Sequence, residues 1–169
     1  MVSESARMNS AAEARFRVTA PDSAPRATKV IALDAAGDAV VRRLARSRWQ
    51  CASFLTFERL EADDPGGSPA QQNALHDLAG RPTTVPDAVD SADLVVLVAG
   101  PGGHAHAASL VGEACSRRRV MTMGFVVGAG SAPDSALSKT LAQVRPWSLM
   151  VVVADSDEYI DDMMTALRA

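Results

Sequence analysis

Six consecutive apolar residues, Leu94-Val-Val-Leu-Val-Ala99, constrain the fold of this chain more than any other segment. Side chains of a strand point alternately to its two faces, so a strand that is apolar at every position must be covered on both faces. The run is far shorter than the roughly 20 residues of a membrane-spanning helix, and Gly100-Pro-Gly-Gly103 ends it abruptly. We therefore expect a central parallel strand at 94–99, and no membrane partner.

Extended and helical patterns alternate along most of the chain. Apolar and β-branched runs predict five strands, at 29–33, 52–57, 94–99, 120–127 and 149–153. Helical spacing predicts helices at 39–45, 104–118, 134–144 and 159–167, with shorter helical segments at 71–78 and 86–91. Such alternation is typical of the α/β class, here a three-layer, doubly wound, mainly parallel sheet of the Rossmann-like type.

The length and composition fit one domain. A domain of 169 residues buries roughly 70% of the surface of its unfolded chain, which suffices for a core. Aromatic residues make up only 4% of the sequence, so Ala, Val, Leu and Met must form that core. Residues 1–28, with Pro21 and Pro25 and little apolar periodicity, predict a flexible N-terminal leader. Residues 29–169 predict a single α/β domain of the nucleotide-binding type.

The charge and the cysteines bear on partners and compartment. With 17 basic and 20 acidic residues the net charge is −3, so no overall field attracts a nucleic acid. Cys51 and Cys115 form no CxxC motif, and the N-terminus has no apolar signal core. We therefore expect a protein of the reducing cytoplasm that binds no nucleic acid.

Ligands of an open parallel sheet bind at the edge where the strands end. The segments expected at this edge are 34–38, 100–109 and 128–131. Gly100, Gly102 and Gly103 would let an anion approach backbone N–H groups, so this turn is a candidate phosphate cradle. A tight strand-to-helix turn has the same composition. In the first segment Asp34 puts a carboxylate where a phosphate would sit, which favours a structural turn there.

Other polar residues carry weaker signals. His104 and His106 follow the glycine turn and could contact a ligand or act as acid or base, but residues two apart on a helix point in different directions, which disfavours a shared metal. Cys115 falls on an apolar helix face and is expected in the core. Acidic residues near the C-terminus fit a cation site or, as we favour, a helix start: Asp155, Asp157, Glu158, Asp161 and Asp162.

The order of elements resembles the N-terminal nucleotide-binding domain of the tubulin/FtsZ family. The segment Ser91-Ala-Asp-Leu-Val-Val-Leu-Val-Ala-Gly-Pro-Gly-Gly103, with the Ala-rich stretch after it, is similar to the strand, glycine-rich signature G-G-G-T-G-T/S-G and helix of that family. Lys29-Val-Ile-Ala-Leu-Asp-Ala-Ala-Gly-Asp-Ala-Val-Val41 is similar to its first strand and glycine-rich loop. The chain departs from the signature at 104–107, where His-Ala-His-Ala replaces Gly-Thr-Gly-Thr/Ser, and in the first loop, where alanines replace glycines.

The resemblance implies a site for a guanine nucleotide or another small anion. Residues at matching positions are Ala36, Gly37, Asp38, Gly100, Gly102, Gly103, His104 and Asp155, the last standing where the family contacts the base. The catalytic loop of the family follows a long central helix that this sequence does not contain, so GTP hydrolysis is not expected. The sequence therefore predicts a non-hydrolysing nucleotide- or anion-binding regulatory or scaffold module.

Two other functions stay open. A small Rossmann-like enzyme could use His104 or His106 as acid or base beside the anion site. A pure interaction module could dock a protein partner or a second copy of the chain. It would do so through an apolar face of the sheet layer or through the last helix, which carries Met163, Met164 and Leu167.

Overall fold

The computed structural model describes residues 25–57, 73–103, 105–156, 158–167 and 169. One sheet has the strand order β4-β3-β2-β1-β5-β6-β7. The strands are β1 Thr28–Ala32, β2 Ala52–Phe57, β3 Ala74–Asp77, β4 Pro82–Thr84, β5 Leu94–Ala99, β6 Met121–Val127 and β7 Met150–Ala154. The helices are α2 Ala35–Leu44, α4 Val85–Asp90, α5 Ala107–Arg118, α6 Asp134–Val144 and α7 Glu158–Ala166, with 3-10 turns η2 Ala129–Ser131 and η3 Arg145–Trp147.

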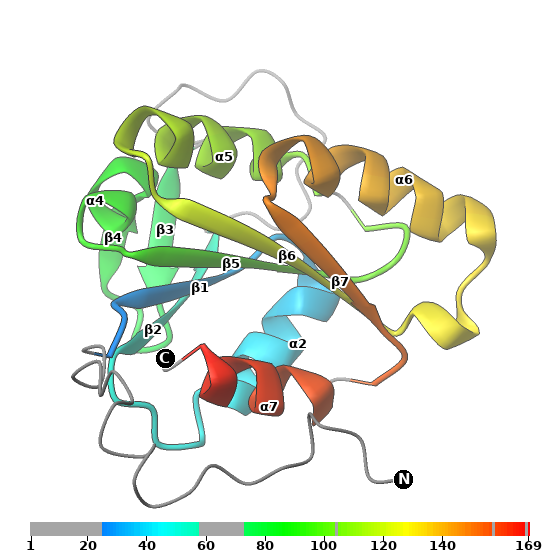
Figure 1. Ribbon diagram of the computed structural model, residues 1–169, viewed down its shortest axis with the longest axis horizontal. Coiled ribbons are helices and arrows are strands. Elements are labelled where there is room, and N and C mark those ends of the chain that lie inside the picture. The colour runs from blue at the N-terminus through cyan, green and yellow to red at the C-terminus, as the bar shows by residue number, and fades with distance from the viewer. Residues whose placement is uncertain (1–24, 58–72, 104, 157, 168) are drawn as a thin grey trace, which may run out of the picture.

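The predicted α/β class and mainly parallel sheet are confirmed. Strand β5 lies at the centre of the parallel part, paired with β1 on one side and β6 on the other. Every residue of β5 is at most 1% exposed, as its unbroken apolar run predicts. Helices α5 and α6 cover one face of the sheet, whereas α2 and α7 cover the other (Figure 1). The two faces hold separate apolar clusters, so the molecule has three layers.

The helical segment predicted at 71–78 is wrong. Residues 71 and 72 lie outside the described part, and Ala74–Asp77 forms β3, which pairs antiparallel with β2 and with β4. The Asp77 carboxylate accepts hydrogen bonds from the backbone N–H groups of Ala79 and Arg81, both at 2.9 Å, and Gly80 takes a φ of 78°. This turn chemistry closes a hairpin, because a side-chain acceptor and a left-handed residue reverse the chain. The hairpin adds two strands to the five predicted.

The remaining elements lie close to their predicted positions. Strand β1 begins at Thr28, within one residue of the predicted start of the domain, and residues 1–24 of the predicted leader lie outside the described part. Helix α5 begins at Ala107 rather than at residue 104. Helix α2 begins at Ala35, four residues before the predicted start, because the Asp34 side chain caps its first turn.

Candidate functional site

The edge predicted to hold a ligand is where β1 and β5 end side by side. These strands run parallel in a register that pairs Ala32 with Val98, so the segments that follow them meet. The first segment supplies Asp34 and the start of α2, and the second supplies the glycine turn at 100–103. Two of the three predicted edge segments are therefore in direct contact.

The Asp34 carboxylate occupies the cradle between these segments. Asp34 is only 4% exposed. Its Oδ1 accepts a hydrogen bond from Gly37 N at 2.7 Å, and its Oδ2 accepts one from Gly100 N at 2.9 Å. A Cβ atom on Gly103 would lie 2.0 Å from Oδ2, so the turn closes tightly over the carboxylate. The protein's own anion therefore stands at the place where a phosphate was predicted.

Helix α6 binds the rest of the glycine turn. Gly102 N donates to Thr140 Oγ1 at 2.9 Å and to Ala136 O at 3.0 Å. Thr140 Oγ1, which is fully buried, donates in turn to Gly100 O at 3.0 Å. Pro101 has no N–H. Gly100 N and Gly102 N therefore donate to groups of the protein and do not face an external anion.

The amide that follows the turn is bound in the same way. Ala105 N donates to Gln143 Oε1 at 3.0 Å. Sequence reasoning missed both Thr140 and Gln143, although their spacing of three residues puts them on one side of a helix. Their partners lie 38 residues earlier in the chain, so only the packing of α6 against the turn reveals them.

The three site residues predicted in the first loop lie in the first turn of α2. A Cβ atom on Gly37 would lie 2.3 Å from Val98 O, so its lack of a side chain serves helix-to-strand packing. The side chain of Ala36 comes close to Gly100, where an added Cβ would meet it at 2.5 Å. Asp38 accepts a hydrogen bond from Arg42 Nε at 2.6 Å along the helix. Each of the three therefore has a structural partner.

The structure describes two of the other three polar residues predicted for this site. His104 lies outside the described residues. His106 is exposed at the start of α5, 3.4 Å from Gln143 Nε2. Asp155 follows β7, two strands along the sheet from β5, and its carboxylate packs against Gly130. In the part of the chain that the structure describes, no group of acidic, histidine and cysteine side chains could hold a metal ion.

Cys115 lies in the core, as predicted. Its side chain is 2% exposed and belongs to the apolar cluster under α5. Burial raises the pKa of the Cys115 thiol, because an apolar environment disfavours the charged thiolate. A cysteine with these properties is a poor nucleophile.

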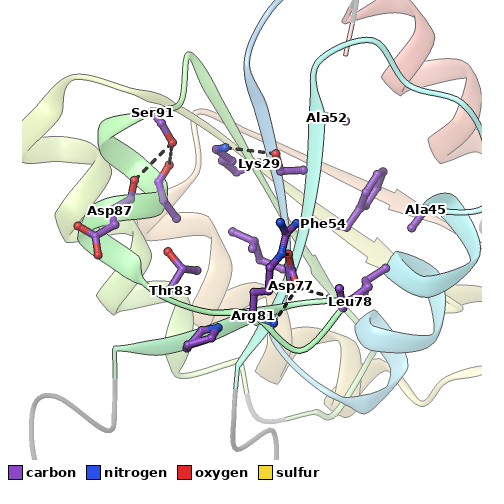
Figure 2. A pocket seen from close by; sticks show the side chains of 15 residues that line it. Lys29, Ala45, Ala52, Phe54, Asp77, Leu78, Arg81, Thr83, Asp87 and Ser91 are labelled. Atoms are coloured by element: carbon purple, nitrogen blue, oxygen red, sulfur yellow. Dashed lines mark hydrogen bonds and ion pairs between the residues drawn. The ribbon is translucent and has the colours of Figure 1, made fainter.

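A second candidate site lies at the amino edge of the sheet, where the parallel strands begin. A cavity of about 530 Å³ lies between the first residues of β1 and β2, the β3–β4 hairpin and the end of α4 (Figure 2). It is lined by apolar residues such as Phe54, Leu78 and Pro82 and by polar ones such as Lys29 and Arg81. No sequence motif marks this cavity, because its walls come from several elements that are separate in the sequence.

The amino-acid sequence was compared with known families and proteins. A scan against protein-family models finds no match to this chain, and a search of curated proteins finds no significant relative. Among the residues described, no helix has the length and apolar character needed to cross a membrane.

Proposed function

We propose that this chain is a non-hydrolysing scaffold domain, a divergent relative of the FtsZ N-terminal domain, that works by docking and not by cycling a nucleotide. One observation carries the proposal: the Asp34 carboxylate fills the amide cradle at the carboxyl edge of the sheet. A phosphate there would have to displace a buried carboxylate and would face its negative charge. A cytoplasmic location is part of the proposal, and it is favoured by two cysteines that form no disulfide.

The docking surface in this proposal is the free edge of β7, and its partner is a second copy of the chain. Strand β7 ends the sheet, and the segment 148–154 contains no charged residue and no proline. Leu149, Met150 and Val153 are 79%, 49% and 43% exposed. Apolar edges of this kind pair with other strands unless charges, prolines or bulges protect them.

The opposite edge of the sheet carries such protection. Strand β4 has three residues and begins with Pro82, which has no N–H to donate. Arg81 and Asp77 form an ion pair of 2.6 Å beside it. The contrast indicates that the unprotected edge at β7 serves for binding. The last helix, the other docking face considered, buries Met164 completely in the core, with Met163 and Leu167 packed around it.

The charges at the two ends of β7 favour a symmetric partner. Arg145 precedes the strand and Asp155 follows it, and both are exposed. Within the described ranges neither takes part in an ion pair. Antiparallel pairing of two copies about a two-fold axis places the Arg145 end of one strand beside the Asp155 end of the other. Parallel pairing would instead bring like charges together.

Calorimetry should detect no binding when GTP, GDP or inorganic phosphate is titrated into the wild-type protein. The reason is that the amides of Gly37, Gly100 and Gly102 already donate to Asp34 or Thr140. Saturable heat with any of these three ligands would contradict the closed cradle.

Self-association through β7 should be visible by size-exclusion chromatography with light scattering. We expect the wild-type protein to be a dimer, and Val153→Lys to make it a monomer, since an edge lysine opposes strand pairing. Arg145→Glu should also weaken the dimer, because it places two acidic groups together at each end of the pair. Adding Asp155→Arg to that variant should restore it.

Ala39→Lys is the matched control for Val153→Lys, because it adds the same charge on the exposed side of α2 and should leave the dimer intact. A wild-type monomer at protein concentrations of tens of micromolar would overturn the role of β7. So would a dimer that tolerates Val153→Lys.

A further inference from the structure

The cavity at the amino edge of the sheet lies in a notch beside β2. Strand β3 pairs with β2 only over residues 55–57. In the described part of the chain, no strand pairs with residues 52–54 on the side away from β1. The hairpin turn, with Leu78 and Arg81, lines the far side of this gap. The first residues of β2 therefore form an open stretch of strand edge.

The backbone of Ala52 offers a donor and an acceptor to this notch. Successive residues of a strand turn their N–H and C=O groups to opposite sides. Thr28 N on β1 donates to Cys51 O at 3.0 Å, so the backbone groups of Cys51 face β1 and those of Ala52 face the notch. The N–H and C=O groups of Ala52 are therefore placed to pair with one more strand, as at other open sheet edges.

The two faces of the sheet give the notch two different walls. Lys29 lies beside Ser53 in the register of β1 and β2, and both belong to the face on which α4 packs. Ala52, Phe54 and Leu78 belong to the other face, where they pack against the apolar cluster under α2. Figure 2 shows Lys29 on the α4 side of the strands and Leu78 on the α2 side. Because residues of both faces line the cavity, it passes around the edge of β2 from one face to the other.

Lys29 supplies a positive charge on the α4 side of the notch. It is half-buried, and its Nζ donates to Ser53 Oγ at 3.2 Å, so the ammonium reaches over β2 towards the open edge. An ammonium has three N–H donors, and this hydrogen bond uses one of them. The ion pairs of the described residues include none with Lys29. An acidic side chain placed beside Ser53 would therefore offset the cost of holding a half-buried charge.

The two carboxylates that line the cavity are engaged elsewhere. Asp77 accepts hydrogen bonds from two backbone N–H groups and from Arg81 Nε at 2.6 Å. The backbone hydrogen bond from Arg81 is the main cause that lowers the pKa of Asp77, so this carboxylate stays charged and paired with Arg81. Asp87 accepts a hydrogen bond from Thr84 Oγ1 at 2.6 Å, and in Figure 2 its carboxylate points away from Lys29.

We infer that the notch binds an extended peptide segment of a partner protein, which adds a short strand beside Ala52 and carries an acidic side chain next to an apolar one. Paired residues of a sheet point to the same face and successive residues to opposite faces. The residue opposite Ala52 thus places its side chain against Phe54 and Leu78. Its neighbour in the peptide points to the α4 face, where an acidic side chain meets Lys29 Nζ.

Strand addition at an open edge is a recurring mode of peptide recognition, in which the backbone gives affinity and alternate side chains give specificity. Here the alternation explains how one ligand reaches both walls of the cavity. The inference goes beyond the proposed scaffold function and uses neither the cradle nor β7. Its failure would leave the docking proposal untouched, and the reverse also holds.

Nuclear magnetic resonance titration with the acetylated and amidated peptide Thr-Val-Glu-Val-Thr tests the inference. Its two valines point to one face of a strand and its glutamate to the other. We expect shifts in the backbone resonances of residues 52–54 and 78–81. The peptide with glutamine in place of glutamate should bind about three- to fivefold more weakly, the usual size of a cross-strand charge pair.

Methylation of peptide nitrogens tests the strand pairing itself. N-methylation of both valines removes the N–H groups that would face Ala52 and should weaken binding at least about tenfold. N-methylation of the glutamate should change the affinity little, because its N–H points away from β2. Equal binding of the two methylated peptides, or no shift at about 5 mM of the parent peptide, far weaker than a functional affinity, would overturn the inference.

Substitutions in the protein separate the charge from the backbone. Lys29→Met keeps the aliphatic stem and should bind the glutamate and glutamine peptides equally, whereas Lys139→Met, which removes an exposed lysine on α6, should keep the preference for glutamate. Ala52→Pro removes the N–H in the notch at the first residue of β2, where proline is tolerated, and should weaken both peptides. The spectra report whether each variant is folded.

Two further outcomes would contradict the inference. A preference for glutamate that persists in Lys29→Met would show that the acidic side chain does not meet this ammonium. A dimer that survives Val153→Lys but is lost in Ala52→Pro, by light scattering, would show that a second copy of the chain occupies the notch instead of a partner peptide.

Discussion

Replacing Gly37 with alanine is expected to lower the free energy of unfolding by about 3 kcal/mol, although glycine-to-alanine changes within helices usually raise it. The added Cβ would lie 2.3 Å from the carbonyl oxygen of Val98. That oxygen belongs to the central strand and already accepts a hydrogen bond from Leu33 N at 2.9 Å. Because backbone lies on both sides of the contact, relief requires moving α2 away from the sheet.

Urea denaturation would measure the loss directly, and thermal denaturation should show a midpoint about 6–12 °C lower. Gly80→Ala is the control, because Gly80 has a φ of 78° but nothing within 4 Å of an added Cβ. It should cost only about 1 kcal/mol, the strain of a left-handed backbone. If Gly37→Ala cost no more than Gly80→Ala, the close approach of α2 to β5 would be refuted.

The tubulin/FtsZ resemblance assigned Gly37 to a nucleotide site, whereas the close approach of Gly37 to Val98 O gives it a role in helix-to-strand packing. A glycine beside a phosphate and a glycine beside a strand look the same in the sequence, since both are required by a close approach. The adjacent Asp34 distinguishes them. A carboxylate at the end of the first strand already indicated a structural turn, and the hydrogen bonds from Gly37 N and Gly100 N give the reason.

Local patterns predicted the central part of the fold because the physical requirement there is local. An unbroken apolar run demands cover on both faces, and the residues of β5 are buried accordingly. Contacts between distant residues have no such signal. Thr140 reaches the glycine turn only when α6 packs on the sheet. Nothing in the sequence around residues 52–54 indicates that the pairing of β2 with β3 ends at Leu55.

The predicted helix at 71–78 was wrong because a local pattern does not show what a segment pairs or packs with. A short apolar segment fits either a helix or a strand, and pairing with β2 selects the strand. The pattern of the last helix shows which of its faces is apolar but not what covers that face. In the structure Met164 of this face lies in the core. The exposed large apolar residues lie in and beside β7, at Leu149, Met150 and Val153, on α7 at Tyr159 and on β6 at Met121.

Asp34→Ala is expected to cost about 3 kcal/mol, because it removes a helix cap and leaves two buried N–H groups without acceptors. Asp34→Asn should lower the free energy of unfolding less, because its amide oxygen can still accept the hydrogen bond from Gly37 N. It should still be less stable than the wild type, because its NH2 group cannot accept from Gly100 N. The order of stability is therefore wild type, then Asn, then Ala. Asp134 is an exposed acidic residue at the start of α6 and provides the control. Asp134→Ala should lower the free energy of unfolding by at most about 0.5 kcal/mol.

Asp34→Ala also tests whether the cradle is a closed anion site. If Asp34 stands where a phosphate would bind, then Asp34→Ala leaves the amides of Gly37 and Gly100 free to donate to an external anion. Inorganic phosphate should then raise the melting temperature of Asp34→Ala, by an amount that grows with the logarithm of the phosphate concentration above its Kd, while the wild type and Asp134→Ala respond equally weakly. A wild type that responds as strongly as Asp34→Ala would mean that phosphate binds elsewhere. An Asp34→Ala variant as stable as the wild type would show that the carboxylate does not hold the turn.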